Sequence, residues 1–136
     1  MNINKLKAGD WVMFNLAPVK VVEIHNTLGE LTVADISSIF DTPASEIEPL
    51  PLTIEILEKN EFTIGNYNEW SNPCCSFLHF VIDNLETNEW GVYARETMYE
   101  VHIATIRYVH ELQHLLYALN VHCNIVTVSN GRKEDK

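Results

Sequence analysis

The sequence predicts an α+β protein in two lobes: a small β lobe, followed by an antiparallel β-meander packed against one C-terminal α-helix. Three observations lead to this prediction. Residues 6–36 alternate strand and turn signals, residues 76–103 contain three further strand-like runs, and an apolar stripe at helical spacing follows them. The chain of 136 residues suits one domain or two small lobes. We place the lobes at residues 1–47 and 48–130, and expect a disordered tail at residues 131–136.

The first lobe is predicted from closely spaced strand and turn signals. A Gly9-Asp10 turn precedes the run WVMF, and residues 19–25 then largely alternate between apolar and polar side chains. Residues 27–29 carry turn chemistry, and ELTVADI resumes the strand pattern. The opening GDWV and the three short strands resemble the start of small SH3-like barrels of the KOW type, which implies an SH3-like β lobe. We expect Pro18 to interrupt this region.

A proline-rich connector and a short helix are predicted next. Residues 37–52 hold three of the five prolines, so we expect a surface connector between the lobes. The segment TIEILEKNEF predicts a short helix that Thr53 caps and that Asn60 ends in a left-handed conformation. So short a helix is marginal alone, and its apolar residues must therefore pack on the rest of the lobe.

The second lobe is predicted to contain a three-stranded meander. Residues 63–75 are polar and rich in turn formers, whereas residues 76–83 form an almost continuous apolar strand. NLETN provides a hairpin loop, and EWGVYAR and TMYEVHI provide two more strands. After a long helix, residues 121–128 are predicted to form a last strand.

One long amphipathic helix is predicted over residues 104–120. At about 100° per residue, one face collects the residues that should be buried: Thr105, Tyr108, Val109, Leu112, Leu115, Leu116 and Leu119. The opposite face should be solvated and carries Arg107, His110, His114 and Tyr117. Arg107 and Glu111 are four residues apart, so we expect an ion pair between them.

The charge balance narrows the class of partner. The formal net charge is −10, and residues 21–94 contain thirteen acidic side chains and one basic side chain. Nucleic acids and anionic membranes attract basic proteins, so neither is expected as a partner. No apolar run approaches the ~18 residues of a membrane span, and the N-terminus lacks the apolar region of a signal peptide. We therefore expect a cytoplasmic protein.

The cysteines agree with a reducing compartment. Cys74 and Cys75 are adjacent, a spacing that rarely permits an unstrained disulfide, and Cys123 makes the number odd. We interpret all three as small apolar residues.

The segment His110-Glu111-Leu112-Gln113-His114 matches H-E-x-x-H, the one pattern here with clear chemical content. Histidines four residues apart on a helix share one face, where both imidazoles can bind one zinc ion at about 2.0–2.1 Å. A glutamate beside the first histidine can act as base toward a zinc-bound water. The pentapeptide resembles the zinc metallopeptidases, which implies zinc, the two histidines as ligands, and Glu111 as catalytic base.

A catalytic zinc needs a third protein ligand, and no common motif spacing places one in this sequence. The metzincin extension would need glycine and histidine where the chain has Tyr117 and Asn120. His122, beyond the helix end, and Glu134, in the expected tail, are the residues left for this role. The alternative is that the histidines belong to a solvated helix face and bind no cofactor.

Two segments together resemble a group of small uncharacterised proteins encoded by phages, prophages and mobile elements of gut-type bacteria. They are PLPLTIEILEKNEF, which follows the GDWV start, and IRYVHELQHLLYAL. The resemblance implies a genomic setting and no established activity. It also implies that Y-V-H-x-L-Q is a structural helix, in which Leu112 is informative whereas Glu111 and His114 are incidental.

These observations favour a non-enzymatic accessory or adaptor protein that binds a protein partner. The acidic, aromatic-rich middle of the chain or the amphipathic helix would form the contact, and a second copy of the chain is one such partner. The alternative, from another class, is a zinc-dependent metallopeptidase-like hydrolase that uses His110, Glu111 and His114.

Overall fold

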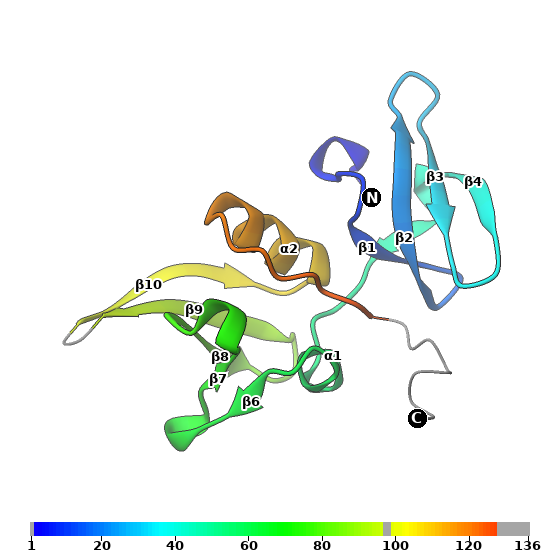
Figure 1. Ribbon diagram of the computed structural model, residues 1–136. Coiled ribbons are helices and arrows are strands. Elements are labelled where there is room, and N and C mark those ends of the chain that lie inside the picture. The colour runs from blue at the N-terminus through cyan, green and yellow to red at the C-terminus, as the bar shows by residue number, and fades with distance from the viewer. Residues whose placement is uncertain (1, 97–98, 128–136) are drawn as a thin grey trace. The chain divides into compact units, whose positions relative to one another are not determined.

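The computed structural model describes residues 2–96 and 99–127 (Figure 1). In this part of the chain, two five-stranded antiparallel sheets are followed by a C-terminal helix. The predicted α+β class is confirmed at this level, with more β structure than helix. The tail predicted for residues 131–136 lies outside the described residues.

The chain divides into two compact units, each of which contains one sheet. The first unit holds the described residues up to Leu50 together with residues 126–127. The second unit runs from Pro51 to Ile125.

The first sheet has the strand order β4-β3-β2-β1-β5, and all neighbours are antiparallel. Its strands are β1 (Trp11–Phe14), β2 (Ala17–His25), β3 (Glu30–Ala34), β4 (Ile39–Pro43) and β5 (Ile47–Pro49). The 3-10 helices η1 (Ile3–Lys5) and η2 (Ala44–Glu46) accompany them. Apolar residues, mostly at alternate strand positions, form its core: Leu6, Val12, Val19, Val21, Leu31, Val33 and Ile47.

The break between strands that was predicted at Pro18 lies instead at Asn15 and Leu16. Asn15 and Leu16 have φ angles of 52° and 68° and form the turn between β1 and β2, while Pro18 lies inside β2 opposite Met13. Proline is tolerated there because β3 pairs along β2 only as far as Lys20. Pro18 therefore has a neighbouring strand on one side only.

The conformation predicted for residues 37–52 is wrong, because this segment contains β4, η2 and β5. Its prolines lie at strand ends instead of preventing strands. Pro43 is the last residue of β4 and Pro49 the last of β5, where a missing N–H costs the ladder least. Pro51 forms an isolated antiparallel bridge with Tyr108.

The second sheet has the order β10-β9-β8-β7-β6 and is also antiparallel. Its strands are β6 (Thr63–Ile64), β7 (Trp70–Ser71), β8 (Leu78–Asn84), β9 (Glu89–Glu96) and β10 (Tyr99–Ile106), and the 3-10 helices are η3 (Asn66–Asn68) and η4 (Pro73–Cys75). The predicted meander is confirmed as β8-β9-β10. The turn-rich region before it adds two short strands.

The short helix α1 (Ile54–Lys59) begins as predicted. The hydroxyl of Thr53 accepts a hydrogen bond from the N–H of Ile56 at 3.3 Å. Its end differs from the prediction, since Asn60 keeps a φ of −99° and Glu61 takes the left-handed conformation at 70°. The side-chain amide of Asn60 donates to the Ile56 carbonyl at 2.8 Å, so it caps the helix without left-handed backbone.

The helix α2 (Val109–Ala118) is shorter than predicted, because β10 continues to Ile106. Val109, Leu112 and Leu116 are buried, as the stripe predicts. The prediction is wrong for Thr105 and Leu119, which are exposed because Thr105 lies in β10 and Leu119 follows the last residue of α2, whereas Tyr108 and Leu115 are partly buried. Buried large residues on one face of the sheet in the same unit include Trp70, Leu78, Phe80, Trp90, Val92 and Ile106.

The last strand predicted for residues 121–128 is absent from its described part, residues 121–127. The residues still alternate in burial, since Ile125 is buried whereas His122 and Asn124 are exposed. The alternation of apolar and polar residues therefore predicted which side chains are buried, but among the described residues no strand pairs with this segment. No described helix is long and apolar enough to cross a membrane.

Candidate functional site

The first turns of α2 hold the two histidines of the H-E-x-x-H pattern. The ring centroids of His110 and His114 are 5.6 Å apart, so the helical spacing brings them together as predicted. His110 differs from the prediction of a solvated face, because it is only 7% exposed. Its ring stacks on that of Tyr108, with an interplanar angle of 7° and the ring centroids 5.9 Å apart.

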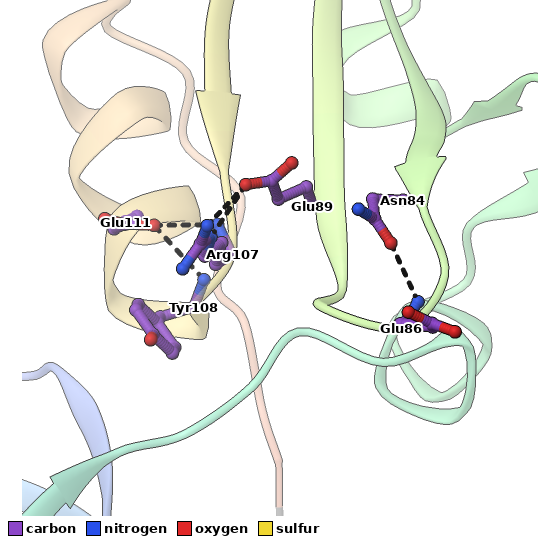
Figure 2. A network of polar contacts seen from close by, with 6 residues as sticks. All are labelled: Asn84, Glu86, Glu89, Arg107, Tyr108 and Glu111. Carbon is purple, nitrogen blue, oxygen red and sulfur yellow. Dashed lines mark hydrogen bonds and ion pairs between the residues drawn. The ribbon is translucent and has the colours of Figure 1, made fainter.

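The carboxylate of Glu111 accepts two backbone hydrogen bonds at the start of α2 (Figure 2). Its Oε1 accepts hydrogen bonds from the backbone N–H of Arg107 at 2.8 Å and of Tyr108 at 3.2 Å. These N–H groups precede the first helical turn and have no partner within the helix. The carboxylate therefore caps the helix, and its charge suits the positive end of the helix dipole.

The predicted ion pair between Arg107 and Glu111 is wrong, because Arg107 pairs with Glu89 instead. The Arg107 guanidinium binds the carboxylate of Glu89 at the start of β9, with Nε to Oε2 at 3.1 Å (Figure 2). This hydrogen bond raises the pKa of Arg107 above its ordinary value. Arg107 thus joins β9 to the start of α2, while only its backbone contacts Glu111.

The two residues considered for a third zinc ligand are not brought to the histidine pair by any described contact. The side chain of His122 is exposed, and its carbonyl accepts from the Sγ of Cys74 at 3.5 Å. Glu134 lies outside the described residues. Over residues 2–96 and 99–127, no group of three or more histidine, cysteine or acidic side chains could hold a metal ion. The zinc hypothesis stays a prediction.

A different surface of the second unit, the outer edge of β10, was not singled out from the sequence. The described sheets end in four edge strands, β4, β5, β6 and β10. β6 has two residues, β5 has three, and both β4 and β5 end in proline. β10 has eight residues and contains neither proline nor lysine. Short length, proline and lysine protect sheet edges against pairing with other chains, so β10 is the least protected edge.

The shape of β10 is regular over its first half. Its register with β9 runs from Tyr99 to His102, and a shift then occurs before Ala104. Such a bulge increases the local twist, which limits further pairing beyond it. The segment Tyr99–His102 is therefore the part of the edge best suited to accept another strand.

Apolar side chains are exposed along β10 at every second position. Tyr99, Val101 and Ile103 are 77%, 57% and 39% exposed. In the first unit, by contrast, the most exposed apolar residues lie in turns and bends, namely Leu16, Leu28 and Ile36, and Ile39 is a single exposed apolar residue at the start of edge strand β4. A row of exposed apolar residues on an edge strand is typical of an interaction surface, whereas single ones on turns are common.

The polar face of the same sheet is internally paired. His79, Tyr93 and His102 lie opposite one another on β8, β9 and β10, and the rings of Tyr93 and His102 are 5.1 Å apart. His79 Nδ1 lies 3.6 Å from the Glu69 carboxylate. These cross-strand contacts support the sheet next to β10.

The second unit is acidic, and its arginines are engaged with glutamates. Residues 51–125 contain ten acidic and three basic side chains, a net charge of −7. Arg95 binds two carboxylates, those of Glu69 and Glu100, which raise its pKa. The second unit as a whole is therefore negative, and a positively charged segment would be attracted to it.

Comparison with protein-family models, curated proteins and solved structures finds no match to this chain.

Proposed function

We propose that this protein is a non-enzymatic accessory protein, and that it binds its partner by accepting an extended segment at the outer edge of β10. The observation that carries the proposal is that β10 alone among the four described edges is long and free of proline and lysine. An added strand gains main-chain hydrogen bonds from such an edge, and side-chain contacts at alternate positions give selectivity.

The chemistry around β10 favours a partner segment that alternates apolar and basic side chains. Its apolar residues would cover Tyr99 and Val101, which solvent now contacts. Its lysines or arginines would meet the negative field of the second unit, whose net charge is −7. A second copy of this chain is less suitable, because each copy would present the same acidic surface.

The first unit is, in our proposal, an SH3-like barrel that supports this binding function. Its five strands pair in the order β4-β3-β2-β1-β5, and a 3-10 helix precedes the last strand. The resemblance to proteins of phages and mobile elements, like the cytoplasmic setting, stays a prediction.

The experiment is affinity capture from a lysate of the source organism, with three forms of the immobilised chain. The wild type should retain a partner, Val101→Lys should lose it, and Ile39→Lys should keep it. Ile39 is a matched control because it is also an exposed apolar residue, 68% exposed, on an edge strand of the other sheet. Equal capture by all three forms, or capture by none, would contradict the proposal.

A zinc-dependent hydrolase is the second candidate function, and the adjacent rings of His110 and His114 favour it. Elemental analysis of untagged protein tests it. About one zinc per chain, lost in both His110→Ala and His114→Ala, would support this candidate. Substoichiometric zinc that neither substitution changes would count against it.

A further inference from the structure

Three cysteines that are scattered in the sequence gather in the second unit. Cys74 and Cys75 lie in η4, and Cys123 lies in the segment that follows α2. The thiol of Cys74 donates to the carbonyl of His122 at 3.5 Å, and His122 is the residue before Cys123. Cys74 also lies close enough to Cys123 to raise the pKa of the Cys123 thiol. All three cysteines are free thiols.

The three thiols differ in their access to solvent. Cys74 is exposed, Cys123 is intermediate and Cys75 is buried. Burial raises the pKa of Cys75 to about 11. Burial, followed by the interaction with Cys74, raises the pKa of Cys123 to about 12. A dissolved reagent therefore meets Cys74 first, because Cys74 is the exposed thiol.

We propose that Cys74 and Cys123 form a thiol–disulfide modification site, at which a small soluble disulfide such as glutathione disulfide converts the pair into an intramolecular disulfide. Cys75 takes no part, because it is buried and because adjacent cysteines rarely reach disulfide geometry. The proposal is independent of the strand-binding function.

The reaction consists of two exchange steps. The Cys74 thiolate attacks one sulfur of glutathione disulfide, which forms a mixed disulfide and releases one glutathione thiolate. The sulfur of Cys123 then gives up its proton and attacks the Cys74 sulfur, so that the second glutathione leaves. The two cysteines lose two electrons, glutathione disulfide gains them, and the two thiol protons end on the two glutathione molecules.

The product joins η4 to the segment after α2 across the whole meander. A cross-link between such distant positions restricts the unfolded chain and should raise the unfolding midpoint of the second unit. In a reducing compartment the bond would form only when the supply of small disulfides rises. The site would then stabilise this unit under oxidising conditions.

The test is mass spectrometry of the full chain after incubation with glutathione disulfide and alkylation of the remaining thiols. The wild type should lose two of its three thiols, and an unreduced digest should contain Cys74 joined to Cys123. Cys75→Ser should behave in the same way and serves as the matched control. Cys123→Ser should stop at the mixed disulfide on Cys74, and Cys74→Ser should form no intramolecular disulfide.

Three results would overturn the proposal. They are a Cys74–Cys75 disulfide, a mixed disulfide that persists in the wild type, and disulfides between chains as the main product. Circular dichroism of each variant before oxidation shows whether it is folded. Should any of the three serine variants fail to fold, partial alkylation of the wild type locates the first thiol to react, which must be Cys74.

Discussion

The two sheets of this protein have the same number of strands and the same antiparallel pairing, but their edges differ. The first sheet ends in β4 and β5, both of which finish in proline. The second ends in the two-residue β6 and the eight-residue β10. Sheet edges that must stay unpaired carry protective features, so the contrast locates the edge at which binding is permitted.

The largest expected effect comes from removing the second sheet's central aromatic residue. Trp90 is fully buried, and its Nε1–H donates to the Leu52 carbonyl at 2.9 Å. Trp90→Ala should reduce the free energy of unfolding by about 3–5 kcal/mol, because it leaves a cavity and an unpaired carbonyl. Urea unfolding followed by circular dichroism measures this change, with Leu31→Ala as the counterpart in the first sheet. A loss below about 1 kcal/mol for Trp90→Ala would show that the second sheet does not depend on this core.

The contrast between the edges is tested most simply by placing lysine on each. Val101→Lys should weaken partner binding by about tenfold or more, equivalent to at least ~1.4 kcal/mol, because lysine protects an edge and repels a basic segment. Ile39→Lys should leave binding unchanged. Both residues are exposed, so both variants should keep wild-type stability within about 0.5 kcal/mol. Titration calorimetry with the captured partner measures the affinities, and equal losses in both variants would remove the distinction between the edges.

The cap of α2 is expected to have a smaller effect. Glu111→Ala removes the acceptor for two N–H groups and should cost about 1 kcal/mol. Glu111→Gln keeps an oxygen acceptor and should cost less. A capping role predicts that partner binding survives in both folded variants. Complete loss of a zinc-dependent hydrolysis in Glu111→Gln, with stability unchanged, would instead assign Glu111 to catalysis.

The smallest effect concerns the hairpin between β3 and β4 in the first sheet. The Asp35 carboxylate accepts hydrogen bonds from the N–H groups of Ser37 and Ser38, both at 2.8 Å, which lower its pKa. Its folded pKa lies below its unfolded value of 3.8, so its stabilisation is present above pH 3.8 and is lost as the pH falls through the folded pKa. Thermal unfolding between pH 2 and 5 should show a shallower pH dependence in Asp35→Asn. Identical pH profiles in the two proteins would exclude this contribution.

Local signals predicted the meander and the start of α1 because they act within a few residues. Thr53 caps α1 through its own side chain, and the loop NLETN joins two apolar runs. The segment with three prolines was predicted wrongly, because composition does not distinguish a proline inside a strand from one at its end, such as Pro43.

The candidate site depended on information that a single sequence lacks. TMYEVHI was predicted as a strand, but whether a strand lies at the edge of a sheet depends on which strands pair beside it. His110 was placed on the exposed face because helical periodicity omits contacts with residues outside the helix, such as the stacked ring of Tyr108. The cysteine pair likewise requires the return of the chain after α2 to η4.

Hydrogen–deuterium exchange of the chain, alone and with its captured partner, tests the central claim most directly. Addition of a partner strand to β10 predicts slower exchange of backbone amides within Tyr99–Ile106, with no change in β4 and no protection in Val101→Lys. Protection confined to α2 or to the first sheet, with unchanged exchange in β10, would contradict the account.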